Sequence, residues 1–159
     1  MRALSLPGLH RLTPLAPLVL RLIVGVVMVA HGLQKLTGGP AAFGEGAIAA
    51  LELPAPALLG WLVTLVELLG GIGLLLGLFT RVATLGIAAL MVGTTVLVKR
   101  DAGLIGAEGA GAELDLLILA GAVALALTGP GQPSVDHVIG VEGTTPTPAP
   151  AGRRPVRAR

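Results

Sequence analysis

The sequence predicts an all-α integral membrane protein, a four-helix transmembrane bundle with a disordered C-terminal tail. The 159 residues are 53% hydrophobic and only 13% charged, whereas an ordinary soluble domain carries about 25% charged residues. Four apolar runs approach the roughly 20 residues that an α-helix needs to cross a ~30 Å hydrocarbon core. The 24 glycines would weaken soluble helices, but in lipid small residues permit close helix packing.

Turn-favouring residues separate the four apolar runs. The expected spans are residues 15–36, 57–79, 82–98 and 110–128. The segment Thr37-Gly38-Gly39-Pro40 ends the first run. Only Thr80 and Arg81 separate the second run from the third, so we expect these two spans to form a tight antiparallel hairpin. The fourth run reaches full length only if Glu113 and Asp115 stand at its entrance.

The charged residues predict both domain limits and orientation. We expect a cytoplasmic N-terminal segment (1–14), a membrane domain (15–138) and a disordered tail rich in Pro and Arg (139–159). Basic residues concentrate on the cytoplasmic side of membrane proteins. With both termini inside, the basic residues on the cytoplasmic side are Arg2, Arg11, Arg81 and the four tail arginines, and those outside are Lys35, Lys99 and Arg100. The prediction is therefore an inner-membrane protein with N- and C-termini in the cytoplasm.

The composition excludes several classes of chemistry. Because the chain has no cysteine, it cannot form disulfides, thiolate metal sites or a CxxC dithiol relay. The histidines at positions 10, 31 and 137 are too scattered to predict a metal site, and no nucleotide or haem motif is present. The net charge of +2 gives no support to nucleic-acid binding. Any redox chemistry must therefore use a cofactor, a quinone or a partner protein.

Two charged residues lie away from the ends of the expected spans. Glu67 is near the middle of the second span, where a charge costs about 2.5 to 3.5 kcal/mol on insertion scales. It must be protonated, paired or facing a wet cavity. Arg21 lies about six residues into the first span, and two interpretations stay open. Its long side chain either extends to the cytoplasmic interface or forms a buried pair with Glu67.

Further polar residues gather near the outer ends of the spans. His31, Gln34 and Lys35 have the i, i+3, i+4 spacing that places them on one helix face. Glu113 enters the fourth span at the same level. We therefore expect His31, Lys35, Glu67 and Glu113 to converge on one cavity that opens to the extracytoplasmic side. The third span offers no obvious charged residue to this site.

The combination of these residues resembles the DoxX family of small bacterial membrane proteins. The resemblance covers about Leu15 to Val138. It rests on Arg21 with His31-Gly32-Leu33-Gln34-Lys35-Leu36, Glu67-Leu68-Leu69-Gly70-Gly71 with Gly77-Leu78-Phe79-Thr80-Arg81, and Gly129-Pro130-Gly131 with Ser134-Val135-Asp136. It implies a four-helix bundle in the bacterial inner membrane. It also implies a link to oxidoreductase systems, because relatives include a subunit of a thiosulfate:quinone oxidoreductase and a mycobacterial member associated with superoxide dismutase and a sulfurtransferase.

The resemblance also selects candidate site residues. The residues assigned to a catalytic role are Glu67, His31 and Arg21. Those assigned to substrate binding are Gln34, Lys35, Arg81 and Glu113.

Three functions follow as hypotheses. The first is a component of a membrane oxidoreductase system that passes electrons from a small reductant to quinone or serves oxidative-stress defence. The second is a non-catalytic anchor for soluble redox partners, and the third is a small-solute transporter. The expected partners are the lipid bilayer and soluble or membrane redox proteins, with a homo-oligomer left open. Quinone is the cofactor or substrate considered, and no metal or nucleic acid is expected.

Overall fold

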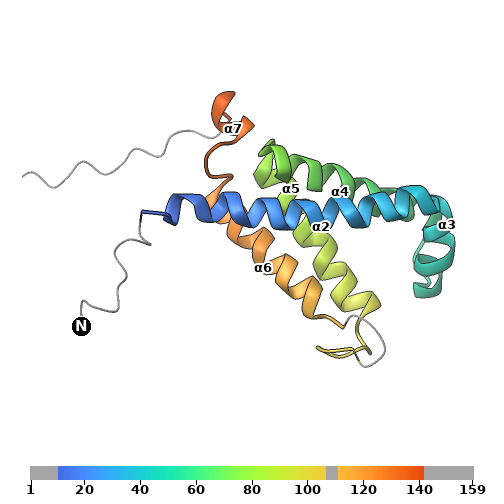
Figure 1. Ribbon diagram of the computed structural model, residues 1–159. Helices are drawn as coiled ribbons and strands as arrows, with labels where there is room; N and C mark the ends of the chain where they lie inside the picture. Colours follow the sequence, from blue (N-terminus) through green and yellow to red (C-terminus); the bar gives the residue numbers. More distant parts are fainter. Residues whose placement is uncertain (1–10, 107–110, 142–159) are drawn as a thin grey trace, which may run out of the picture.

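The computed structural model describes residues 11–106 and 111–141, and every regular element within them is helical (Figure 1). The all-α prediction is therefore confirmed for this part of the chain. Most of the predicted N-terminal segment and residues 142–159 of the predicted tail lie outside the described residues. Residues 139–141 were assigned to the predicted tail. In the structure the amides of Ile139 and Val141 donate to the carbonyls of Val135 and Asp136, respectively.

The first membrane helix is longer than its apolar run. A 3₁₀ turn, η2 (Thr13–Leu15), leads into α2 (Ala16–Gly38). Prolines stand in the first turns of both segments, where the missing N–H has no helical partner to lose. Gly39, with a φ of +90°, ends α2 in a backbone conformation that favours glycine.

A short helical segment follows α2, where the sequence predicted only a connection. It consists of α3 (Pro40–Phe43), a π-helical turn η3 (Gly44–Ile48) and a 3₁₀ turn η4 (Ala49–Leu51). It packs closely on the start of the next helix, because a Cβ atom on Gly44 would overlap the backbone of Pro56 and one on Gly60 that of Pro40. Figure 1 shows that this segment extends sideways from the C-terminal end of α2.

The second and third spans form the predicted hairpin. Helix α4 (Pro56–Leu76) is followed by α5 (Thr80–Gly93), which continues as the π-helical turn η5 (Thr94–Val98). The three-residue turn between them contains Gly77 and Phe79, with φ values of +65° and +48°. Gly77 therefore ends α4, and it also leaves room for the Arg21 side chain of α2, which a Cβ atom on Gly77 would overlap.

The fourth helix is shorter than predicted. Within the described residues, three helical segments are long and apolar enough to cross a membrane: Thr13–Gly38, Pro56–Leu76 and Thr80–Val98. Helix α6 (Glu113–Thr128) has 16 residues, or about 24 Å at 1.5 Å per residue. Residue 110, the first of the predicted fourth span, lies outside the described residues. The fourth span therefore stays a prediction.

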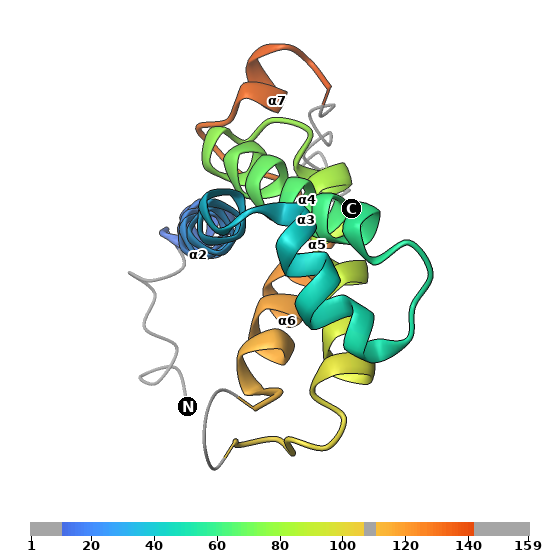
Figure 2. The ribbon, with the colours of Figure 1, turned by 90° about the vertical axis from the view of Figure 1, so that its right-hand side faces the viewer.

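The helices form two antiparallel pairs that diverge from a common end. Helix α2 packs on α4, and α5 packs on α6. A Cβ atom on Gly25 would lie 3.0 Å from the carbonyl oxygen of Gly71, and one on Gly32 would lie 2.7 Å from the amide of Leu68. These glycines therefore allow α2 and α4 to touch through their backbones. Figures 1 and 2 show α5 and α6 running obliquely away from the α2–α4 pair.

The common end holds the buried core and a short C-terminal helix. The core cluster is Val24, Met28, Leu74, Ile87, Met91, Ile118, Ala122 and Leu125. Helix α7 (Val135–Val138) lies against the α4–α5 turn, because the Asp136 amide donates to the Gly77 carbonyl at 2.8 Å. Large apolar side chains such as Ile23, Leu69, Leu85 and Leu117 are exposed. A surface this apolar is typical of contact with lipid.

Candidate functional site

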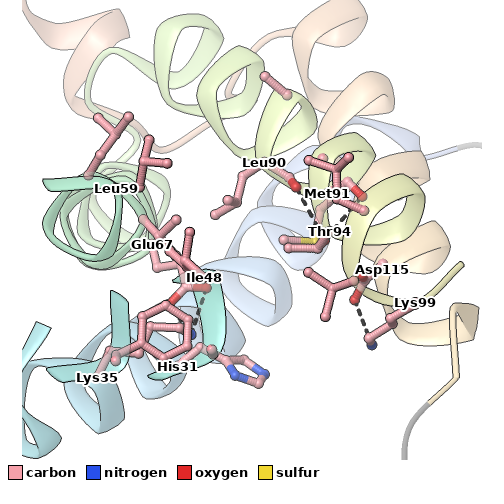
Figure 3. A pocket seen from close by; sticks show the side chains of 18 of the residues that line it. His31, Lys35, Ile48, Leu59, Glu67, Leu90, Met91, Thr94, Lys99 and Asp115 are labelled. Atoms are coloured by element: carbon pink, nitrogen blue, oxygen red, sulfur yellow. Dashed lines mark hydrogen bonds and ion pairs between the residues drawn. The ribbon is translucent and has the colours of Figure 1, made fainter. Parts of the chain in front are cut away.

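A cavity of about 470 Å³ opens between the two diverging helix pairs. One wall is formed by α2 and α4, and the other by α5, η5 and α6, while α3, η3 and η4 cover one side (Figure 3). Most lining side chains are apolar, among them Met28, Phe43, Ile48, Leu51, Leu53, Leu59, Leu62, Val63, Leu90, Met91, Leu97, Val98, Leu114 and Ile118. The polar lining residues are His31, Lys35, Glu67, Thr94, Lys99 and Asp115.

The α2–α4 wall carries one ion pair. Lys35 Nζ donates to Glu67 Oε2 at 2.7 Å and to Oε1 at 2.9 Å. The two side chains are 15% and 7% exposed, and the Lys35 ammonium also lies 5.1 Å from the centre of the Phe43 ring. A carboxylate at membrane depth needs such a partner, because an unpaired charge there is costly. Both oxygens of Glu67 are thus occupied by Lys35.

The α5–α6 wall carries a second ion pair. Lys99 Nζ donates to Asp115 Oδ1 at 2.9 Å and to the Gly111 carbonyl at 2.8 Å. Asp115 is 6% exposed. Its other oxygen, Oδ2, is buried and has no hydrogen-bond partner among the described residues. Figure 3 shows the two ion pairs on opposite sides of the cavity.

Three of the predicted site residues lie together at this cavity. Two other predicted site residues, Gln34 and Glu113, do not line it. His31, Lys35 and Glu67 all line it. Gln34 is exposed and is not among the lining residues. The expected convergence is wrong for Glu113, whose Oε1 instead accepts the Gly111 amide at 3.3 Å.

The proposed pair between Arg21 and Glu67 is not formed. Arg21 is buried near the common end of the helix pairs, where it donates to the carbonyl of Pro133 and lies in the electrostatic field of Asp136. The backbone contact of α2 with α4 fixes their register and brings Arg21 level with Gly77. Glu67 is therefore several turns away and pairs with Lys35.

Arg81 also lies at the common end. It is the second residue of α5, on an exposed face, and donates to the Ala126 carbonyl at 2.6 Å, which joins α5 to α6. The nearby Asp136 carboxylate accepts the amides of Phe79 and Thr80 at 2.7 and 2.9 Å. These contacts explain locally why the chain carries an Arg after the turn and an Asp in α7.

The sequence analysis missed Lys99 and Asp115 as cavity residues. Lys99 follows the predicted third span (82–98), which ends at the same residue as η5, and was counted only among the basic residues outside the membrane. Asp115 was passed over for Glu113, although a periodicity argument distinguishes them. Asp115, Ile118, Ala122 and Leu125 follow a helical repeat and are all buried, whereas Glu113 is off that face.

Apolar helices of spanning length define this chain as a multi-pass α-helical membrane protein. Residues 16–100 match the family model DoxX, and the chain belongs to the DoxX family. The matched range holds Lys35, Glu67 and Lys99 but stops before Asp115.

Two bacterial relatives support this membership. The "Uncharacterized membrane protein Rv3486" of Mycobacterium tuberculosis is 35% identical over 145 residues, which cover 86% of this chain and 88% of the relative. The "Putative oxidoreductase CatD" of Bacillus subtilis is 34% identical over 113 residues, which cover 70% of this chain and 78% of the relative. No solved structure matches this chain.

Proposed function

We propose that this protein is a component of a membrane-bound oxidoreductase system and binds quinone in the cavity between its helix pairs. The observation that carries the proposal is an apolar cavity with one ion pair on each of two facing walls. Its volume falls in the range of about 300 to 1,000 Å³ that is typical of small-molecule sites. The relative named as an oxidoreductase, at 34% identity, supports the same assignment.

A quinone matches both the apolar side chains and the charged side chains that line the cavity. Its ring and isoprenoid tail are apolar and match side chains such as Leu62 and Leu97, which line the cavity and are also exposed on the surface. A lipid-soluble ligand therefore has a route from the bilayer to the cavity. Its two carbonyl oxygens gain negative charge during reduction, and the ammonium groups of Lys35 and Lys99 stabilise such charge.

The reaction takes two electrons and two protons per quinone and yields the quinol. The electrons come from a small reductant or from a redox partner protein. Protons reach the ring oxygens through side chains that exchange them, and His31, Glu67 and Asp115 are those that line the cavity. The role of this chain is thus to hold the ring, stabilise charge on its oxygens and deliver protons.

We also propose that the protein lies in the bacterial inner membrane with both termini in the cytoplasm. The start of α2 and the short helix α7 lie at the same end of the molecule, because Arg21 donates to Pro133. This arrangement supports the proposal that both termini of the described chain face the same side of the membrane. The cavity then lies toward the extracytoplasmic side.

The single tryptophan, Trp61, provides a direct test of quinone binding. The chain has one Trp and no Tyr, and Trp61 lies on α4 beside the cavity residue Leu62. Titrating the purified protein in nanodiscs with a short-chain quinone should quench Trp61 fluorescence to a saturating level. Quenching by quinone dissolved in lipid alone rises without saturation.

A cavity-filling variant supplies the control. Gly93 lines the cavity, and a Cβ atom there would meet no atom within 4 Å, so Gly93→Leu should fold and abolish the saturable phase. Gly46 has equally open surroundings but does not line the cavity, so Gly46→Leu should retain it. If the wild type shows no saturable phase, quinone binding is wrong, and the anchor or transporter hypothesis becomes the better one.

A further inference from the structure

The two carboxylates of the cavity are not equivalent. Glu67 has both oxygens bonded to Lys35 at 2.7 and 2.9 Å. Asp115 has one oxygen bonded to Lys99 at 2.9 Å, whereas its buried Oδ2 has no partner in the described part of the chain. The asymmetry marks Asp115 as the carboxylate with capacity for a ligand.

A buried acceptor without a donor is unfavourable, and more so when it carries charge. Asp115 is 6% exposed and lines the cavity, so the group best placed to donate to Oδ2 is a hydrogen-bond donor on the cavity's occupant. The two oxidation states of a quinone ring differ in this respect. The oxidised ring has only carbonyl acceptors, whereas the reduced ring has two hydroxyl donors.

We propose that Asp115 is a specificity-determining residue whose Oδ2 accepts a hydroxyl hydrogen of the bound ring, so that the cavity binds the reduced, dihydroxy form more tightly than the oxidised form. This inference rests on the proposed quinone binding. Lys99 holds the other carboxylate oxygen and thereby fixes the orientation of Oδ2. Both oxygens of Glu67 are already bonded to Lys35, so we expect Glu67 to contribute to both ring states alike.

The test compares three probes built on the same tetramethyl ring, of which only one has hydroxyl hydrogens to donate. Binding of tetramethylhydroquinone, its dimethyl ether and tetramethylquinone to the full-length protein in nanodiscs is measured anaerobically by equilibrium dialysis. A hydrogen bond to a charged group is worth about 1.5 to 3 kcal/mol. We therefore expect the hydroquinone to bind at least about tenfold more tightly than either the ether or the quinone.

Paired substitutions assign the preference to Asp115 without stranding a charge. The double variant Asp115→Leu, Lys99→Met leaves no acceptor at position 115 and should reduce the ratio of hydroquinone to ether affinity to about one. The matched double variant Glu67→Gln, Lys35→Met removes the other pair and should weaken all three probes by the same factor, which keeps the ratio. A ratio that follows Glu67 and not Asp115 would overturn the assignment.

The wild-type measurement alone separates the two proposals, even if a variant does not fold. Equal affinity for the hydroquinone and its ether, with saturable binding of both, overturns the role of Asp115 and leaves quinone binding intact. Failure of all three probes to bind overturns both proposals.

Discussion

Lys35 and Glu67 form a two-bond ion pair between α2 and α4, with Nζ 2.7 and 2.9 Å from the two carboxylate oxygens. Glu67→Gln removes one charge and leaves the ammonium of Lys35, which is 15% exposed, without its partner. Breaking a buried pair in this way costs about 3 to 5 kcal/mol. We expect a clear loss of membrane abundance and of thermal stability in detergent.

The control for this prediction removes both charges. The double variant Lys35→Met, Glu67→Gln should recover most of the lost stability, because no unpaired charge remains. The exposed residue Glu45 lies on η3, and Glu45→Gln should be indistinguishable from the wild type. Equal stability of the Glu67→Gln and wild-type proteins would show that the pair is not formed in the membrane.

Asp136 is predicted to stabilise the α4–α5 turn. Its carboxylate accepts the Phe79 and Thr80 amides at the start of α5, as an N-cap residue does. Replacement of a capping residue by Ala typically costs about 0.5 to 2 kcal/mol, and Asp136 makes two such bonds. Asp136→Ala should therefore lower the midpoint of thermal unfolding, whereas Asp101→Ala, at an exposed position, should not. Quinone affinity should stay unchanged, because the cavity lies at the other end of the helices.

The orientation in the membrane is testable by single-cysteine labelling, since the native chain has no cysteine. Gly38 and Ala102 are exposed at the cavity end of the helices, and Val138 is 84% exposed at the other end. An impermeant thiol reagent should label Gly38→Cys and Ala102→Cys in intact cells, and Val138→Cys only after lysis. The reverse pattern would invert the proposed orientation. Thr80 is completely buried and is unsuitable for labelling.

The depth of α6 decides whether the protein has three spans or four. Leu117 is 71% exposed on this helix, and the four-span prediction places it in contact with lipid. A spin label on Leu117→Cys should then be more accessible to oxygen, which concentrates in the bilayer, than to a water-soluble nickel chelate. A label at exposed Asp101 should show the opposite preference. Greater access of nickel to position 117 would contradict the fourth span.

Hydropathy and turn residues predicted much of this fold. The α4–α5 hairpin follows from two long apolar runs with almost nothing between them, and the i, i+3, i+4 spacing placed His31 and Lys35 near Glu67. Hydropathy did not predict how far α2 is shifted along its axis relative to α4. The ends of apolar runs suggested that Arg21 and Glu67 lie at similar depth, whereas the contact of Gly25 with Gly71 fixes a different alignment.

Other features had weak sequence signals. The segment α3–η4 is rich in Ala and Gly, which have no marked periodicity, so a helical cover over the cavity was read as a connection. Lys99 directly follows the last residue of both the predicted third span and η5, so its charge looked like an ordinary loop charge. Its role depends on Asp115, a contact across a 16-residue separation that no local pattern encodes.

The pairing of charges within each cavity wall also determines how the cavity responds to membrane voltage. Each wall combines one ammonium with one carboxylate, so each pair has zero net charge. The transmembrane potential acts on net charge that moves through the field, at about 2.3 kcal/mol per elementary charge per 100 mV. Entry of an uncharged ring into this cavity moves no net charge, so its affinity should be the same in energised and de-energised membranes.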